Sequence, residues 1–300
     1  HTIVFFIFLV ANIGGSLSPL GDPPLFLGFL KGVSFFWPTT AMFLPMLFLS
    51  VILLVVYYAL DSFMHRREDE IVPMNNIETG NEGEKLGLEG SVNLLLLAGI
   101  VGFVLYSGFA DDLPAPFGTT AHFLIYDVDI KLANLVRDVG LVALAGLSLL
   151  LTVNESRRLN GFTWFPIIEV ATLFAGIFMT IIPALSILRA GTEGALGWVI
   201  EGVTQPDGTP FNAAYFWATG LLSSFLDNAP TYLVFFNTAG GDPEQLMGEL
   251  SGTLLAISAG AVFMGAVTYI GNAPNFMVRS IAEDRGIKMP SFFGYMAWSV

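Results

Sequence analysis

Three observations predict that this chain is an all-α membrane protein, a polytopic helical bundle with inverted-topology repeats, broken helices and a re-entrant hairpin. Its 300 residues are 54% hydrophobic and only 12% charged, whereas soluble domains carry about 25% charged residues. Several apolar stretches are long enough to span a bilayer, and others of similar length are broken by Gly, Pro, Asn and Asp. Two of the broken stretches also resemble each other in sequence.

Uninterrupted apolar stretches predict ordinary spanning helices, because about 20 apolar residues cross the hydrocarbon core. They cover Pro38–Leu60, Val92–Phe109, Leu132–Val153 and Ile167–Leu188. Further apolar regions contain helix breakers and predict discontinuous helices. These cover Ile3–Leu30, Phe211–Thr238 and Leu250–Ala282.

A polar segment rich in Asn, Gly and Glu predicts a solvent-exposed linker between two parts of the chain. We expect residues 1–60 to be the end of a first inverted repeat, with a broken helix and a spanning helix. Residues 61–91 form the cytoplasmic linker, and residues 92–300 form a second repeat. The chain lacks an initiator Met, and Phe292–Val300 resembles only the first third of a spanning helix. We therefore expect a fragment cut at both ends, with the second repeat truncated at its C-terminus.

Basic residues predict which loops are cytoplasmic. If the ordinary helices alternate and Phe211–Thr238 enters and leaves on one side, the acidic loops Ala110–Ile130 and Ala190–Pro210 lie outside. Eight of the twelve basic residues then lie inside, namely Arg66, Arg67, Lys85, Arg157, Arg158, Arg279, Arg285 and Lys288. A full span at Phe211–Thr238 would move the last three outside, so the charges favour a re-entrant hairpin.

The two similar stretches predict an internal repeat. Gly21-Asp22-Pro23-Pro24 leads to Lys31-Gly32-Val33-Ser34-Phe35-Phe36, and Gly271-Asn272-Ala273-Pro274 leads to Lys288-Met289-Pro290-Ser291-Phe292-Phe293. In the predicted topology the first broken helix runs outward and the second runs inward. Opposite direction is what an inverted-topology repeat requires.

Several classes of function are disfavoured by composition. The chain has no cysteine, which excludes disulfides and thiolate metal sites. Its net charge of −13 argues against nucleic acid as a partner. The three histidines, His1, His65 and His122, are scattered, and no nucleotide loop or Ser/His/Asp arrangement is present in the sequence. We expect neither enzymatic activity nor a resident cofactor.

Three segments at the predicted membrane depth combine helix breakers with small polar side chains, and they cover Asn12–Pro24, Ser223–Thr231 and Thr268–Asn275. Because unpaired backbone groups are costly in hydrocarbon, such breaks survive only inside protein or beside a water-filled cavity. The ends of half-helices then offer backbone dipoles and carbonyl oxygens to an ion. These segments are the predicted ion or substrate site.

Asp227 is the first candidate ligand, because it is an ionisable group in an otherwise uncharged apolar stretch. With Asn228, its carboxylate could bind a hard cation or carry a proton. Alternatively, Asp227 caps the second half of a hairpin. Asp22 permits the same two interpretations, since Pro23-Pro24 also suits a plain helix start.

Amides and hydroxyls supply the other candidate ligands. Asn272 and Asn275 could coordinate an ion or occupy tight turns, and Asn12 lies in the first broken segment. Asp227, Asn228 and Asn272 are the candidate Na⁺ ligands. The candidate hydroxyls could bind an ion or join helices by hydrogen bonds; they belong to Ser16, Ser18, Ser223, Ser224, Thr231 and Thr268.

At these motifs the chain resembles the ion transporter superfamily, which includes NhaD-type sodium/proton antiporters, arsenite exporters, and citrate and dicarboxylate carriers. The matching strings are ANIGGSLSPLGDPP, SSFLDNAPTYLVFFN and GNAPN. The resemblance implies two inverted repeats in a homodimer, each with a re-entrant hairpin and a broken helix that meet near the midplane. The hairpin of the first repeat has no match in the chain.

The resemblance implies secondary active transport in the bacterial inner membrane. The first hypothesis is sodium/proton antiport by alternating access, with Na⁺ and H⁺ as the transported ions. The alternative is cation-coupled transport of citrate or a dicarboxylate, or export of an anion. The expected partners are the lipid bilayer, a small inorganic cation or carboxylate substrate, and a second copy of the chain.

Overall fold

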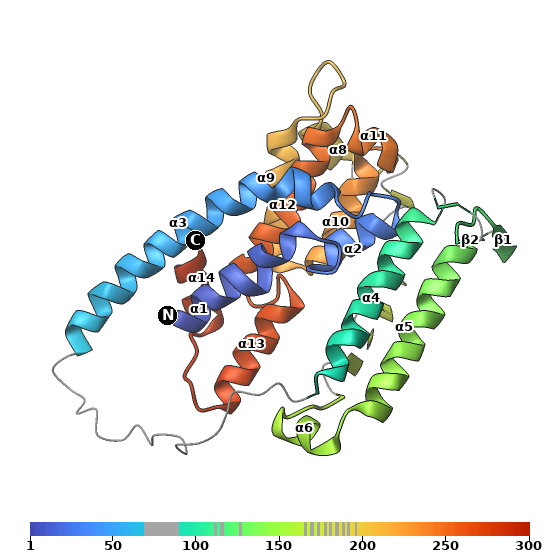
Figure 1. Cartoon of the computed structure of the whole chain (residues 1–300). Helices are drawn as coiled ribbons and strands as arrows, with labels where there is room; N and C mark the ends of the chain where they lie inside the picture. The colour runs from blue at the N-terminus through green and yellow to red at the C-terminus, as the bar shows by residue number, and fades with distance from the viewer. Residues whose placement is uncertain are drawn as a thin grey trace. The chain divides into compact units, whose positions relative to one another are not determined.

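The computed structural model describes residues 1–68, 90–110, 113–114, 117–125, 128–164, 167–168, 171–172, 175–176, 179, 182–183, 186–187, 190, 193–195 and 197–300. Helices dominate these residues, and one two-stranded antiparallel sheet accompanies them (Figure 1). The chain forms two compact units. Unit 1 combines His1–Val72 with Phe165–Val300, and unit 2 is Pro73–Trp164.

Unit 1 begins with a discontinuous helix. Helix α1 (Thr2–Phe6) continues as a π-helix, η1 (Ile7–Asn12), and then as a 3₁₀-helix, η2 (Ile13–Leu17). The chain is extended at Ser18 and resumes helix as α2 (Pro23–Leu30), with prolines in its first turn, where a missing N–H costs little. Gly32, with a φ of 105°, ends α2 in the left-handed conformation that glycine tolerates best.

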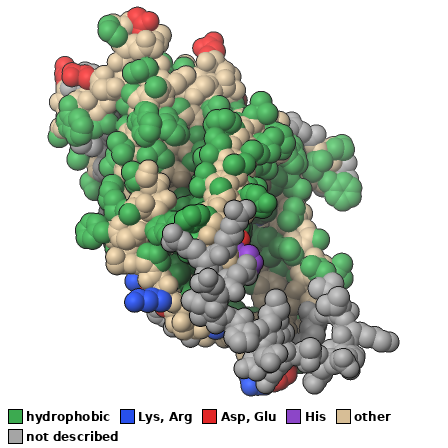
Figure 2. Space-filling view, turned by 90° about the vertical axis from the view of Figure 1, so that its left-hand side faces the viewer, with side chains coloured by type: hydrophobic (Ala, Val, Ile, Leu, Met, Phe, Trp, Pro, Cys, Tyr) green, Lys and Arg blue, Asp and Glu red, His purple; other side chains and the backbone are tan. Residues whose placement is uncertain are grey.

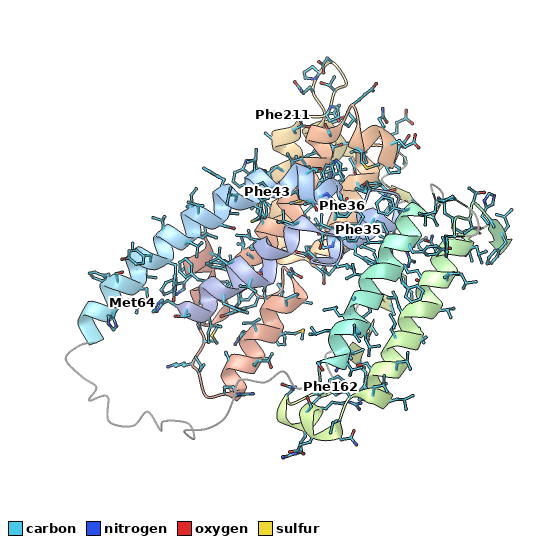
Figure 3. All side chains as sticks on the ribbon, in the orientation of Figure 1. Phe35, Phe36, Phe43, Met64, Phe162 and Phe211 are labelled. Carbon is cyan, nitrogen blue, oxygen red and sulfur yellow. The ribbon has the colours of Figure 1, made fainter. Side chains whose placement is uncertain are left out.

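Helix α3 (Trp37–Glu68) is the longest element. It confirms the spanning helix expected at Pro38–Leu60 and continues through Glu68, so the segment expected to be a linker begins as helix. Phe36 and Phe43 lie at its start (Figure 3). Many of its apolar side chains are exposed, including Leu44, Phe48, Val55 and Tyr58. The face of unit 1 seen in Figure 2 is accordingly covered largely by hydrophobic side chains.

Two further discontinuous helices form the rest of the core of unit 1. After α8 (Gly197–Val203), helix α9 (Asn212–Phe225) stops at Leu226 and Asp227, and α10 (Asn228–Thr238) follows. The short α11 (Pro243–Met247) leads to α12 (Ser251–Met264), the 3₁₀-turn η4 (Gly265–Val267), α13 (Ala273–Asp284) and α14 (Phe292–Ser299). The breaks predicted within Phe211–Thr238 and Leu250–Ala282 are therefore present.

Buried apolar side chains hold these short helices together. One cluster joins α2, α9, α10 and α12 and includes Tyr215, Tyr232, Phe236 and Ile257. A second cluster packs α1 and η1 against α13 and α14. Because the half-helices pack on each other, Asp22, Asn228 and Asn272 at the breaks are buried, whereas Leu226 and Ile270 beside them are more than half exposed.

Unit 2 is a pair of apolar helices, α4 (Val92–Phe109) and α5 (Leu132–Leu151). Between them in sequence lies a β-hairpin of β1 (His122–Ile125) and β2 (Val128–Lys131), which the sequence analysis did not expect. The short α6 (Asn154–Leu159) follows α5. Gly140 of α5 lies against the ring of Phe103, so a small residue allows close packing of α4 and α5.

Three helices of the described residues are long and apolar enough to cross a membrane: Trp37–His65, Val92–Phe109 and Leu132–Leu151. They confirm three of the four predicted spanning helices. The fourth, expected at Ile167–Leu188, falls largely outside the described residues.

Candidate functional site

Five polar side chains from the three broken segments meet in the interior of unit 1. Asn12 ends η1, Asp22 precedes α2, Asn228 begins α10, Asn272 precedes α13, and Asn275 lies in the first turn of α13. Each is at most 3% exposed. The sequence predicted all five as site residues, and the structure brings them together. We refer to them as the polar cluster.

Asp22 is the one carboxylate of the polar cluster. Its Oδ1 accepts a hydrogen bond of 2.9 Å from Asn228 Nδ2, and Asn272 Nδ2 lies 3.5 and 3.4 Å from Oδ1 and Oδ2. Among the described residues no Lys, Arg or His forms an ion pair with it. A buried carboxylate with only neutral partners favours a bound cation or a proton.

Two oxygen atoms of the polar cluster have no hydrogen-bond partner. The Oδ1 atoms of Asn228 and Asn272 are both buried and unsatisfied, although the nitrogen of each amide contacts Asp22. An unpaired buried acceptor is costly, so each such atom calls for a missing donor or cation. The polar cluster therefore combines a carboxylate with two free amide oxygens, which are hard ligands for a small cation.

The N-terminal ends of α2, α10 and α13 lie at the polar cluster. Asp22 and Asn272 are the residues before α2 and α13, and Asn228 is the first residue of α10. The Asn228 N–H donates to the Gly271 carbonyl oxygen at 3.2 Å, which joins the start of α10 to the break before α13. The positive ends of these helices stabilise the negative charge of Asp22.

Close glycine contacts shape both broken helices. A Cβ atom at Gly271 would lie 2.5 Å from the Gly265 carbonyl oxygen and 2.7 Å from that of Ser223. A Cβ atom at Gly21 would overlap the Gly15 carbonyl in the same way. Gly15 and Gly265 were not among the predicted site residues; the signal that could have found them is the six-residue spacing that each pair of glycines shares.

The predicted hydroxyls bond to the backbone instead of lining the polar cluster. Ser16 donates to Ile13, Ser223 to Ala261, Ser224 to Gly220 and Met264, and Thr231 to Asp227. Thr268 donates to the Ser224 carbonyl and accepts from Ile270 and Gly271. The bonds of Ser223, Ser224 and Thr268 join α9 to α12 and to the break after it, as the alternative expected. Those of Ser16 and Thr231 stay within one helical turn. No side-chain hydrogen bond of Ser18 is seen in the described part of the chain, and it is partly buried.

Asp227 occupies a capping position. Its Oδ1 accepts from the Ala229 N–H at 3.0 Å, at the first turn of α10, and the residue is only partly buried. No hydrogen bond between the described residues joins its carboxylate to the polar cluster. Its role as an ion ligand stays a prediction.

Other polar features lie apart from the polar cluster. Thr219 in α9 has a buried hydroxyl without a hydrogen-bond partner, and the buried hydroxyl of Ser258 in α12 interacts with that of Tyr232. Neither residue was among the predicted site residues. No group of three or more His, Asp or Glu suited to a metal ion occurs among the described residues.

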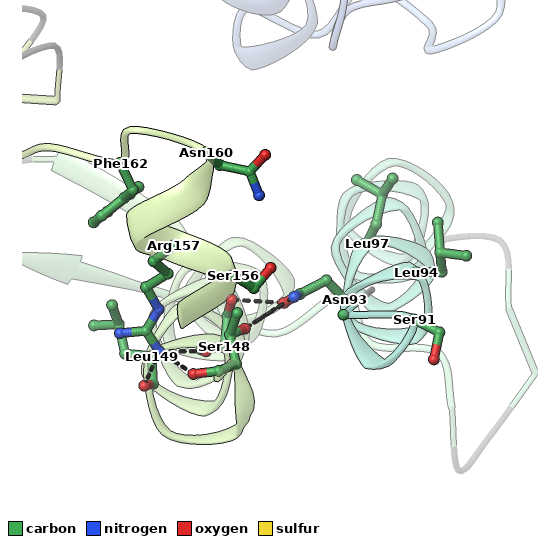
Figure 4. A pocket seen from close by; sticks show the side chains of 12 residues that line it. Ser91, Asn93, Leu94, Leu97, Ser148, Leu149, Ser156, Arg157, Asn160 and Phe162 are labelled. Carbon is green, nitrogen blue, oxygen red and sulfur yellow. Dashed lines mark hydrogen bonds between the residues drawn. The ribbon is translucent and has the colours of Figure 1, made fainter. Parts of the chain in front are cut away.

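Unit 2 contains a cavity of about 440 Å³ between the start of α4, the end of α5 and α6 (Figure 4). Asn93 donates to Thr152 Oγ1 at 2.9 Å and accepts from Ser148 Oγ at 2.8 Å. Arg157 donates to carbonyl oxygens at the end of α5, including that of Thr152 at 2.9 Å. None of the predicted site residues lines this cavity.

Long apolar helices, with buried polar side chains gathered at helix breaks, define an integral membrane protein. The chain belongs to the family described as "Putative citrate transport", which matches residues 1–300. This membership confirms the resemblance to ion and citrate transporters and makes the protein a transporter. Comparisons with curated proteins and with solved structures gave no significant match.

Proposed function

We propose that the protein is a secondary active transporter that binds Na⁺ at Asp22, Asn228 and Asn272 and exchanges it for protons by alternating access. The observation that carries this proposal is the composition of the polar cluster: one buried carboxylate without a basic partner, beside two buried amide oxygens without a donor. A cation would satisfy all three groups at once.

The charge of the polar cluster favours a monovalent cation. Asp22 contributes one negative charge to the polar cluster, and its hydrogen-bond partners Asn228 and Asn272 are neutral. One bound Na⁺ would neutralise that charge, whereas a divalent ion would need a second carboxylate, and the nearby carboxylate of Asp227 caps α10 instead. A proton on Asp22 would neutralise its charge equally well. Na⁺ and H⁺ therefore compete for the same carboxylate, which is the basis of antiport.

Similar backbone geometry supports the inverted-repeat part of this proposal. Gly15, Gly21 and Asp22 are each followed 250 positions later by Gly265, Gly271 and Asn272. Asp22 has φ −150° and ψ 136°, and Asn272 has φ −153° and ψ 134°. A 3₁₀-turn precedes each break, at η2 and η4.

The contacts between the two broken helices favour opposite directions. The first half of one, α1 and η1, contacts the second half of the other, α13, and α2 contacts α12. Residues of η1 and η2 also contact α12. An antiparallel crossing has this pattern, and it is the arrangement expected of inverted repeats. We propose in addition that α9 and α10 form the re-entrant hairpin of the second repeat. The division into residues 1–60, 61–91 and 92–300, the homodimer and the bacterial inner membrane belong to this same proposal.

A second candidate function is cation-coupled transport of citrate or a dicarboxylate. The family description favours it. The starts of α2, α10 and α13 at the polar cluster also suit it, because helix N-termini attract carboxylates. In this case Na⁺ at Asp22 would add positive charge to the place where the anion binds.

Reconstituted protein with a pH-sensitive dye inside the vesicles separates the two functions. Antiport predicts a change of internal pH when Na⁺ is added outside without citrate. Citrate transport predicts Na⁺-dependent uptake of labelled citrate and no pH change in its absence. If neither flux depends on Na⁺, the proposed cation site is wrong.

Asp22→Asn tests the site itself. The variant should fold, because Asn272 adopts the same backbone conformation at the matching position of the second break. It should lose Na⁺-driven flux by about a hundredfold or more, because it lacks the charge that binds Na⁺ or H⁺. Thr219→Val is the control, since it alters a buried hydroxyl outside the polar cluster. Wild-type exchange by Asp22→Asn would disprove the proposal.

A further inference from the structure

We propose that Asn12 and Asn275 are positioning residues, which fix the amide of Asn272 so that its oxygen is free to bind the transported cation. This inference rests on the proposed cation site. Neither residue would touch the ion. They would act through a chain of hydrogen bonds in which each amide determines the orientation of the next.

The chain of hydrogen bonds begins at Asn275, whose orientation the backbone determines. Its Nδ2 donates to the carbonyl oxygens of Gly265 and Thr268, both at 2.8 Å. Carbonyl oxygens only accept, so the nitrogen of this amide must face them. The Oδ1 of Asn275 therefore points the other way, toward Asn12.

The orientation of the Asn275 amide in turn determines that of the Asn12 amide. Its Nδ2 donates to Asn275 Oδ1 at 2.6 Å and to the Ile7 carbonyl oxygen at 2.8 Å, within the π-helix η1. Both hydrogens of the amide are thereby used, and two acceptors exclude the flipped orientation. Its Oδ1 is left to accept a hydrogen bond from Asn272.

Asn272 is the last member of the chain of hydrogen bonds. Its Nδ2 donates to Asn12 Oδ1 at 3.0 Å and faces the Asp22 carboxylate with its other hydrogen. A flipped Asn272 would place its oxygen against Asn12 Oδ1 and against a carboxylate, two repulsive contacts. The unflipped amide leaves Oδ1 buried and without a partner.

Asn228 provides a contrast. Its amide nitrogen also donates to Asp22 and its Oδ1 is also unpaired, but Asp22 is the one side chain seen to orient it among the described residues. The Asn275–Asn12 pair therefore acts on one of the two free oxygens. It also joins residues from the two broken helices, 263 positions apart in the chain.

The test compares Asn12→Leu with wild type in reconstituted protein. Leu has similar volume but cannot orient Asn272. We expect the half-saturating Na⁺ concentration to rise about tenfold, the effect of losing one well-placed ligand, while the rate at saturating Na⁺ stays within about twofold. A role in packing alone would lower expression and thermal stability without Na⁺ but leave the half-saturating concentration unchanged. Thr219→Val serves as the control for removing a buried polar group.

A double-mutant cycle tests whether Asn12 affects Na⁺ affinity only through Asn272. If Asn12 acts only through Asn272, adding Asn12→Leu to Asn272→Leu should cause no further loss of Na⁺ affinity. An additive further loss would overturn the inference, as would unchanged affinity in Asn12→Leu. If Asn12→Leu does not fold, Asn275→Ser replaces it, because a hydroxyl can donate to only one of the two carbonyls that orient Asn275.

Different results would reject the cation site and the positioning role. Wild-type Na⁺ affinity in both Asp22→Asn and Asn272→Leu would reject the cation site. Weakened affinity in those two variants, with normal affinity in Asn12→Leu and Asn275→Ser, would reject the positioning role alone.

Discussion

Asp22 and Asp227 both precede a helix, yet their carboxylates have different partners. Asp227 caps α10 through the Ala229 N–H, whereas the Asp22 side chain makes no capping bond to α2. The sequence after Asp22 explains part of this difference, because Pro24 at the second helical position has no N–H to offer a cap. The N–H of Leu25, at the third position, donates instead to the Asp22 backbone carbonyl at 3.1 Å. The same prolines that made Asp22 resemble a plain helix start leave its carboxylate free for the polar cluster.

Variants of Asp227 test this distinction. Asp227→Ala should lower the free energy of unfolding by about 1 kcal/mol, the usual loss for a missing cap, and Asp227→Asn should lower it less, because Asn also caps helices. In both variants the half-saturating Na⁺ concentration should change less than in Asp22→Asn. Thermal unfolding and Na⁺ titration of the purified proteins measure both quantities. Loss of Na⁺ binding in Asp227→Asn with retention in Asp22→Asn would reverse the assignment.

The breaks in the two discontinuous helices are stabilised by close contacts between backbone atoms. The Gly265 carbonyl approaches Gly271 across the second break, as the Gly15 carbonyl approaches Gly21 across the first. Glycine is required at such positions because any side chain would overlap backbone atoms, which cannot move aside without disrupting the helices. The sequence predicted where the helices break from Gly, Pro and Asn. It did not predict this contact, since the approach of two chain segments depends on how the half-helices pack.

Gly271→Ala should therefore destabilise the protein by about 3 kcal/mol or more, because its methyl group would overlap the carbonyl oxygens of Gly265 and Ser223. Gly102→Ala in α4 is a suitable control, as a Cβ atom there meets nothing within 4 Å. Alanine stabilises a helix interior by about 0.5–1 kcal/mol relative to glycine, so this variant should be at least as stable as wild type. Thermal unfolding in detergent measures both; equal stabilities would show that the break is not held by glycine contact.

For the whole molecule, hydropathy predicted the membrane class and three spanning helices, because apolar length alone determines whether a helix can cross a bilayer. Helix breakers and polar side chains within the other apolar stretches located the five members of the polar cluster. The sequence did not predict that Asn12 pairs with Asn275, nor decide whether the hydroxyls bind an ion or join helices, because the directions of side chains follow from tertiary packing. The β-hairpin formed by β1 and β2 was missed because its strands are short and the alternation of apolar and polar residues along them is weak.

Cysteine labelling tests the topology of these 300 residues, which contain no cysteine of their own that could react in place of the introduced one. Four exposed positions mark the predicted sides: Asp207 and Glu244 flank the α9–α10 pair, and Asn160 and Lys288 follow basic segments. Cysteines at Asp207 and Glu244 should react with an impermeant reagent added outside, because a re-entrant hairpin returns to its starting side. Cysteines at Asn160 and Lys288 should react only from the cytoplasmic side, where basic residues are retained.

Labelling of Glu244→Cys from the cytoplasm would mean that α9 and α10 together cross the membrane. The second broken helix would then run in the same direction as the first, which is incompatible with inverted repeats.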